Sequence, residues 1–567
     1  MTNPSNSPTG AEALVQMLAA HGVKHVFGLC GDTTLPLYDA FHRLDHGITH
    51  FLTRDERHAA YMADGYARIT RRVGVCEGPS GGGATYLLPG VVEADQSSVP
   101  LLAITTDVAT TSRGRFPLTE LDQVALYRPL TRHNESLDDA VSLPSRVRAA
   151  FRATTELPTG AAHLALPFDT QRGAVAAETI YADARYGRYP AHRPRADAGA
   201  VAEAARLLVA AERALVICGG GVVLSGGEAE LLALARHLNT PIATSVSGQG
   251  SVAETDPLAV GVVGANGGVA ATRAVVESSD LIFFIGCRAG SVTTEKWRYP
   301  SRDARVIHLD GDVSVLEANY ATEVSMAGDI KATLAALLEE VKRLAPAGRV
   351  DHGGVARAAG AWEAKLSEFD ALARSDERPI RPERVVAALM RLLGEDAIIT
   401  ADPGTPCPYF SAFYRWRRSG RRFITNRAHG ALGYSLAAAM GAQVGEPGAV
   451  VVAAMGDGSF GMSVGELETA ARYGLPVKLV VFSNASYGWI RAGQRSSFGG
   501  RFYNVDFSRS DHALIASGYG LWSRRVEDPG ELEAVLGEML AVEGPALVDI
   551  ISQPLDEARA PVSEWVA

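Results

Sequence analysis

The stretch from Ala449 to Gly488 constrains the fold more than any other part of the chain. It opens with the apolar run AVVVAAM, continues through the polar turn GDGS and a helical pattern over about 464–473, and closes with the apolar run VKLVVF and the turn SNAS. Two short buried runs joined through a helix indicate a βαβ unit with parallel strands. Open parallel sheets bind ligands at the carboxyl ends of their strands, and both polar turns are expected there.

The two turns carry residues suited to a metal and to phosphate. Asp457 lies between two glycines, so the backbone can pass close to a ligand while a carboxylate oxygen points at it. Asn484 follows the next strand, and its amide oxygen can join that carboxylate around Mg²⁺, which keeps water or phosphate oxygens in its other positions. Gly458 and Ser459 precede a helix and offer N–H groups and a hydroxyl to phosphate. The residues therefore indicate a magnesium diphosphate site.

This pattern resembles the signature of thiamine diphosphate enzymes, and the surrounding GELETAARYGLPV and SYG are similar to the acetolactate synthase branch of that family. The resemblance implies thiamine diphosphate and Mg²⁺ as cofactors, with Asp457, Asn484 and the carbonyl of Ser486 as metal ligands. The family usually has Asn-Asn where this chain has Ser483-Asn484, and the ligand aligns with the second position. The residues of this stretch that the resemblance assigns to cofactor binding are Gly456, Gly458, Ser459 and Asn484.

A second matching segment is RDERHAAYMADGYAR, which begins at Arg54 and resembles an RHEQ-type segment followed by MADGYAR. On this alignment Glu56 is the catalytic glutamate, which hydrogen-bonds the aminopyrimidine ring of the cofactor. The cofactor's own amino group removes the thiazolium C2 proton after the glutamate drives the ring to its imino form. A carboxyl group buried against an apolar ring has a raised pKa, which suits it to sharing that proton.

A third matching segment, FITNRAHGALGYSLAAAMGA, is similar to the family's GGLGTMGYGLPAAIGA. The resemblance assigns Gly430 as the carbonyl that accepts from the cofactor's amino group. It assigns Leu432 as the bulky residue that bends the cofactor so that its amino nitrogen reaches C2. Thr405, in the turn after the strand-like run AIITA, joins the cofactor-binding set.

Strand-like and helical patterns alternate along the whole chain, which predicts an α/β protein of three doubly wound parallel-sheet domains. The resemblance names them as a pyrimidine-binding domain over 10–185, a central domain over 195–345 and a diphosphate-binding domain over 380–560. In the central domain, Gly219-Gly220-Gly221 fits a nucleotide site but is not a GxGxxG fingerprint, and a helix-packing turn is the favoured interpretation. The family's active sites join the first and last domains of two subunits, which implies a homodimer or homotetramer.

Departures from true acetolactate synthases bear on the substrates. Leu118-Thr119-Glu120 stands where the family has Phe-Gln-Glu, so a substrate-facing glutamine is absent. The segment from Arg288 to Glu295 replaces RFDDRVTG and lacks the second arginine, which weakens the case for FAD. Gly493 aligns with the family's acceptor-selecting tryptophan. A larger or different acceptor is therefore expected to fit.

Two further residues favour alternatives. Asp32, in Cys30-Gly31-Asp32, matches a catalytic aspartate of pyruvate and indolepyruvate decarboxylases, although their His-His pair is absent from 105–120. His429, beside Gly430, is a candidate proton donor or a structural histidine. Arg113, Arg115 and Arg491 could each meet a substrate carboxylate, with a solvated surface role favoured for any single one.

The leading hypothesis is that the chain decarboxylates a 2-oxo acid and transfers the acyl group to a second carbonyl substrate. A simple 2-oxo acid decarboxylase or a lyase of 2-hydroxy carbonyl compounds is the alternative, and a catalytically silent paralogue is the third possibility.

Composition limits the partners and the compartment. The net charge of −10 and the absence of a Lys/Arg run argue against nucleic acid, and the apolar runs are strand-sized, far short of a membrane helix. Five cysteines are scattered with no metal or redox spacing, which indicates reduced thiols. The first residues, MTNPSNSPTGAEAL, are polar and lack a signal-peptide pattern, so the sequence predicts a cytoplasmic protein.

Overall fold

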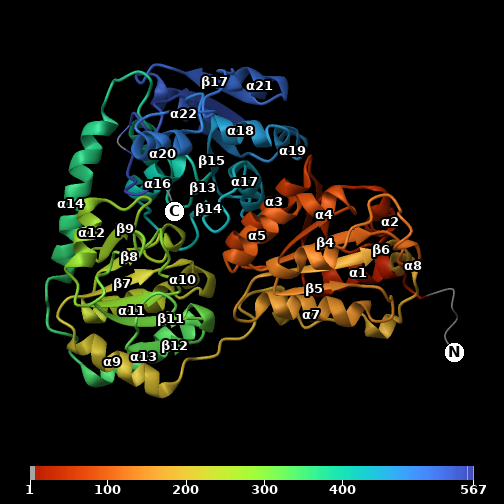
Figure 1. The fold of residues 1–567 in the computed structure, drawn as a ribbon, viewed down its shortest axis with the longest axis horizontal. Helices are drawn as coiled ribbons and strands as arrows, with labels where there is room; N and C mark the ends of the chain where they lie inside the picture. The colour runs from red at the N-terminus through yellow and green to blue at the C-terminus, as the bar shows by residue number, and fades with distance from the viewer. Residues whose placement is uncertain (1–6, 559, 566–567) are drawn as a thin grey trace.

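The computed structural model describes residues 7–558 and 560–565 and contains three six-stranded sheets, in each of which every pair of neighbouring strands is parallel. The predicted α/β class with three doubly wound sheets is confirmed. Figure 1 shows the three lobes: the N-terminal one in red and orange, the central one in green, and the C-terminal one in blue above it. No helix among the described residues is long and apolar enough to cross a membrane.

The N-terminal sheet has the strand order β2-β1-β3-β4-β6-β5. Its strands are β1 (His25–Gly28), β2 (Thr49–Leu52), β3 (Gly74–Gly78), β4 (Leu101–Asp107), β5 (His133–Ser136) and β6 (Ala161–Pro167). Its helices are α1 (Gly10–Ala20), α2 (Leu35–Arg43), α3 (Glu56–Thr70), α4 (Gly82–Tyr86), α5 (Leu88–Gln96), α6 (Gln123–Tyr127), α7 (Leu143–Thr155) and α8 (Phe168–Arg172). Successive residues of β4 enter two separate cores, Leu101 under α3 and α5 and Leu102 under α1 and α7, because side chains alternate across a strand.

The central sheet has the order β12-β11-β10-β7-β8-β9. Its strands are β7 (Ala214–Cys218), β8 (Ile242–Thr244), β9 (Ala259–Val262), β10 (Leu281–Ile285), β11 (Arg305–Asp310) and β12 (Val324–Ala327). Its helices are α9 (Ala198–Ala210), α10 (Gly220–Ser225), α11 (Glu228–Leu238), α12 (Ala270–Glu277) and α13 (Ile330–Leu344), and α14 (Gly354–Ala373) leads to the last sheet. Counted along the chain, this is the 3-2-1-4-5-6 order of doubly wound dinucleotide-binding sheets.

The C-terminal sheet has the order β14-β13-β15-β16-β18-β17. Its strands are β13 (Ile398–Ala401), β14 (Phe423–Thr425), β15 (Val451–Gly456), β16 (Lys478–Ser483), β17 (Trp522–Val526) and β18 (Ala546–Ile551). Its helices are α15 (Pro382–Leu392), α16 (Pro406–Phe413), α17 (Ser435–Gly445), α18 (Asp457–Ser463), α19 (Glu466–Arg472), α20 (Gly488–Phe498), α21 (His512–Gly518) and α22 (Leu532–Ala541). When the strands of each sheet are numbered from its own first strand along the chain, both the C-terminal and the N-terminal sheet have the order 2-1-3-4-6-5.

One local expectation was wrong. The predicted polar turn over 456–459 is the start of a helix, because α18 begins at Asp457 directly after β15, with Gly456 as its N-cap. An acidic residue in the first helical turn is favoured by the helix dipole, so the carboxylate that was expected in a loop begins a helix instead. The expected single helix over about 464–473 is the shorter α19.

The N- and C-terminal sheets meet through α3 and α17, each of which follows the second strand of its sheet (Figure 1). A Cβ atom on Gly65 of α3 would lie 2.4 Å from the carbonyl oxygen of Ala438, and one on Gly441 of α17 would lie 2.0 Å from that of Met62. The two helix backbones therefore touch, and residues of both belong to one buried core. This close approach requires glycine at both positions.

We expect Gly441→Ala to destabilise the protein, because the added methyl group overlaps the α3 backbone and overpacking costs about 1–3 kcal/mol. Gly537→Ala is the matched control: Gly537 also lies inside a helix, and no atom lies within 4 Å of its added Cβ. This control should be neutral or raise stability, since alanine favours helix by about 1 kcal/mol over glycine. Thermal unfolding followed by circular dichroism checks both, and equal transition temperatures for the two variants would contradict the close packing.

Candidate active site

The start of α18, directly after β15, and the turn after β16 lie side by side, because Gly456 pairs with Phe482 in the parallel ladder. Asp457 is buried, and its Oδ2 accepts hydrogen bonds from the backbone N–H groups of Asn484 at 2.9 Å and Ala485 at 2.6 Å. Burial raises the pKa of the Asp457 carboxyl group, and these backbone donors lower it. The carboxylate thus ties the start of α18 to the turn after β16 across the sheet edge.

The same turns offer oxygen donors suited to a hard cation. Oδ1 of Asn484 accepts from the backbone N–H of Ser486 at 3.2 Å, while Nδ2 is buried without a partner among the described residues. Nδ2 is a donor, so it can bind a ligand oxygen such as that of a phosphate, whereas a cation would take Oδ1. Among the described residues no group of three or more His, Cys, Asp or Glu could hold a metal ion. A carboxylate, an amide and a carbonyl fit Mg²⁺ that takes its other oxygens from a ligand.

A cavity of about 370 Å³ adjoins these turns. Gly430 has φ +74° there, a conformation that favours glycine, and Leu432 is half-buried. The cavity is lined only by residues between 265 and 564. The predicted site residues that it brings together are Thr405, His429, Gly430, Leu432, Gly456, Gly458, Ser459 and Ser486.

Glu56 lies elsewhere in the chain, as the first residue of α3 at the carboxyl edge of the N-terminal sheet. It is 7 % exposed, and its Oε1 would be 3.0 Å from a Cβ on Gly83, the second residue of α4. Burial raises the pKa of Glu56, and the negative charges of Asp55 and Glu77 raise it further. The carboxyl group is therefore suited to holding a proton, as the sequence predicted for its role.

Asp32 lies on the same edge, in a short 3₁₀ helix (Asp32–Thr34) after β1, and is exposed. A chain of hydroxyl groups joins the neighbouring turns, with Thr33 bonded to Thr106 at 2.7 Å and Ser80 bonded to Thr119 at 2.6 Å. None of these residues lines the cavity beside Leu432. Within one chain the structure therefore divides the predicted site into two groups, one on the N-terminal sheet and one on the C-terminal sheet.

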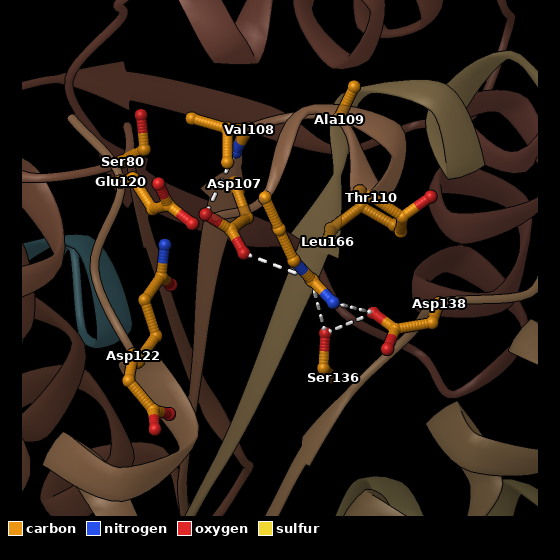
Figure 2. A network of polar contacts seen from close by, with 12 residues as sticks. Ser80, Asp107, Val108, Ala109, Thr110, Glu120, Asp122, Ser136, Asp138 and Leu166 are labelled. Carbon is orange, nitrogen blue, oxygen red and sulfur yellow. Dashed lines mark hydrogen bonds and ion pairs between the residues drawn. The ribbon is translucent and has the colours of Figure 1, made fainter. Parts of the chain in front are cut away.

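Two of the arginines considered as carboxylate binders are already paired. Arg113 contacts Asp107 at 3.1 Å, Ser136 at 3.0 Å and Asp138 at 2.9 Å, three partners that lie together in Figure 2. Arg491 pairs with Asp556 at 3.3 Å, with Asp506 and Glu557 also in range. These pairs hold loops in place.

Sequence reasoning missed a buried carboxylate that holds the loop before α17. Glu93 of α5 is fully buried, and its Oε2 accepts from the backbone N–H groups of Ala428 at 3.2 Å and His429 at 2.7 Å. Its Oε1 accepts from Arg68 at 3.0 Å and Ser97 at 2.7 Å. An N-terminal helix thereby positions the loop that presents Gly430 to the cavity.

Helix α3 holds the other end of that loop, through Tyr434. Arg68 donates to Asp64 at 2.8 Å, and Asp64 accepts from the hydroxyl of Tyr434. Asp402 binds the backbone N–H of Tyr434 at 3.0 Å from the C-terminal side. No local pattern signals these roles, since Asp64 and Arg68 are simply charged residues four positions apart on a helix.

A second cavity, of about 310 Å³, lies at the carboxyl ends of β7, β10 and β11. Gly219-Gly220-Gly221 lines it, and a Cβ on Gly219 would lie 2.0 Å from the carbonyl oxygen of Gly286. The glycine run therefore also permits close packing of two turns. Burial raises the pKa of Asp310, which lines the same cavity, to about 6. The weakened case for FAD at this sheet stays a prediction.

Models of three protein domains match the chain in order. The Thiamine pyrophosphate enzyme N-terminal TPP binding domain matches residues 8–126, the central domain of such enzymes matches 201–337, and their C-terminal TPP binding domain matches 402–550. The first and last matches contain the two groups of site residues.

Curated relatives match over nearly the full length. A probable acetolactate synthase large subunit of Methanocaldococcus jannaschii is 34 % identical, over 96 % of this chain and 92 % of that protein. The acetolactate synthase large subunit of Haemophilus influenzae is 31 % identical, and the isozyme 3 large subunit of Escherichia coli is 30 % identical, each over 94 % of this chain and 92 % of its own length.

We expect Glu93→Ala to weaken thiamine diphosphate binding by about tenfold, because two backbone donors of the cavity loop lose a charged acceptor. Glu93→Gln keeps one acceptor oxygen and should have a smaller effect. Titration of tryptophan fluorescence with the cofactor and Mg²⁺ measures the affinity. Glu203→Ala, at a partly exposed site on α9, is the control. Wild-type affinity in Glu93→Ala would show that Glu93 does not position the loop.

Proposed function

The chain belongs to the thiamine pyrophosphate enzyme family, since three family models match it and a relative 34 % identical spans 96 % of it, and on this premise we propose its reaction. The enzyme decarboxylates a 2-oxo acid and joins the remaining acyl group to the carbonyl carbon of a second small molecule. One observation carries the proposal: a single cavity brings Gly430 and Leu432 beside the metal-binding turns, as the acetolactate synthase-like motifs require.

Each group of residues has a role in this proposal. When bound, thiamine diphosphate supplies the carbon nucleophile that attacks the donor and holds the electron pair after CO₂ leaves. Asp457, Asn484 and the carbonyl of Ser486 would hold Mg²⁺, and the first turn of α18 would bind the diphosphate. Glu56 would exchange a proton with the cofactor's ring nitrogen.

The complete site needs two chains in this proposal, because Glu56 and the cavity belong to separate groups within one chain. Apolar side chains around both groups support this: Phe116 is 96 % exposed and Leu118 85 % exposed near the N-terminal turns, and Ile490, which lines the cavity, is 54 % exposed. A homodimer, or a tetramer built from two, would cover both faces.

Two titratable residues complete the proposed site. Asp32 and His429 are both exposed within one chain, Asp32 on the N-terminal face and His429 at the cavity. In the dimer they would approach the substrate from opposite sides, where either could transfer a proton. We place the domain limits at 10–185, 195–345 and 380–560; the matched ranges 201–337 and 402–550 lie within the second and third.

The experiment that tests the reaction is mass spectrometry of the products formed from pyruvate with thiamine diphosphate and Mg²⁺. We expect CO₂ together with a coupled product, and free acetaldehyde as the sole product would contradict carboligation.

Asp457→Ala should weaken cofactor binding by at least about a hundredfold and abolish its Mg²⁺ dependence, because the cation loses its one carboxylate ligand. Asp39→Ala, at an exposed position on α2, is the control. Cofactor binding unchanged in Asp457→Ala would refute the metal site.

A further inference from the structure

Arg427 lies in the loop between β14 and Gly430 and lines both large cavities. It is half-buried, and it stands two residues before His429 in the loop that Glu93 holds. Its guanidinium group is therefore placed beside the reaction cavity by a segment whose backbone is fixed from the N-terminal sheet. The acetolactate synthase-like motif quoted above has glycine at this position.

The charge of Arg427 is not neutralised within the described part of the chain, where it forms no ion pair. The other fixed cation lining this cavity, Lys296, has Glu564 at 3.6 Å. Arg113 and Arg491, which the sequence offered as carboxylate binders, are paired as well. Arg427 is thus the cation that can accept an anionic ligand in this cavity.

A neutral group holds the guanidinium in place. Asn266 is 1 % exposed, and with its amide oriented to satisfy hydrogen bonding its oxygen accepts from Nη1 of Arg427 at 3.0 Å and from Nη2 at 3.1 Å. An amide fixes the orientation without cancelling the charge. The remaining N–H groups of the fork can bind a carboxylate through two parallel hydrogen bonds.

The substrates of the proposed reaction offer two carboxylates with different fates. The donor loses its carboxylate as CO₂, and a cation held against that group would stabilise the ground state more than the transition state. The acceptor keeps its carboxylate unchanged through the reaction. A fixed guanidinium can therefore bind the carboxylate of an acceptor that is itself a 2-oxo acid without opposing the reaction.

We propose that Arg427, oriented by Asn266, binds the carboxylate of the acceptor and selects a 2-oxo acid over a neutral aldehyde. The inference rests on the proposed function. In the balanced step, R–CO–COO⁻ and R′–CO–COO⁻ with one proton give R–CO–C(OH)(R′)–COO⁻ and CO₂. The bond from the donor's carbonyl carbon to its carboxylate breaks, a bond to the acceptor's ketone carbon forms, and the ketone oxygen takes the proton.

The test is a competition between pyruvate and acetaldehyde as acceptors, with pyruvate as donor. Mass spectrometry measures the ratio of the acidic product, acetolactate, to the neutral product, acetoin, and CO₂ release measures donor turnover. We expect Arg427→Gln to lower the acid-to-neutral ratio at least about tenfold, the size of a lost charge-assisted pair, while CO₂ release is retained. Arg206→Gln, at an exposed position on α9, is the matched control.

Asn266→Asp is the second variant, because it adds a carboxylate of the same shape that neutralises Arg427 without removing it. It should shift the product ratio in the same direction. An unchanged product ratio in both variants overturns the inference. A loss of CO₂ release in Arg427→Gln with normal cofactor binding also overturns it, because that result would assign Arg427 to the donor. A wild-type enzyme that releases no CO₂ from any 2-oxo acid would instead refute the proposed function itself, and the inference with it.

Discussion

The contact between α3 and α17 is the constraint on which the rest of the site depends. Glycines at 65 and 441 let the two backbones touch, and this brings the N-terminal sheet against the C-terminal one. Only then can Asp64 reach Tyr434 and Glu93 reach the loop at Ala428. A buried carboxylate bonded to backbone N–H groups holds a loop firmly, because leaving those donors unpaired costs free energy. The cavity wall is therefore set by a distant domain.

The meeting of Asp457 and Asn484, the proposed metal ligands, could be predicted from the sequence because its geometry is local. Adjacent parallel strands end at one edge, so the residues after them must meet there, and Asp457 does contact the backbone of Asn484. The hydrogen bond that the Ala428 backbone donates to Glu93 joins residues 335 positions apart, and the Arg427–Asn266 pair likewise depends on how whole domains dock. No periodicity or spacing encodes such contacts. Even near the turns, the expected loop at Asp457 is a helix, because a strand can pass straight into a helix without a linking turn.

The N- and C-terminal sheets have the same strand order, so each presents a carboxyl edge built in the same way. One edge carries Glu56 and the other carries Asp457 and the cavity. Within one chain Glu56 does not line the cavity beside Leu432. In the proposed dimer, two-fold pairing of chains would place unlike edges face to face twice. The buried Glu93 network would then connect the helix that begins with Glu56 to the cavity loop of the other site.

The most direct test of this divided site is complementation between two inactive variants. Glu56→Gln and Asp457→Ala are produced separately and by co-expression in equal amounts, and CO₂ release from pyruvate is measured. If each site takes Glu56 from one chain and Asp457 from another, every mixed dimer has one intact site, so random pairing restores about a quarter of wild-type activity. Activity no higher than that of the separate variants would contradict the account, because it would place both residues in the site of a single chain.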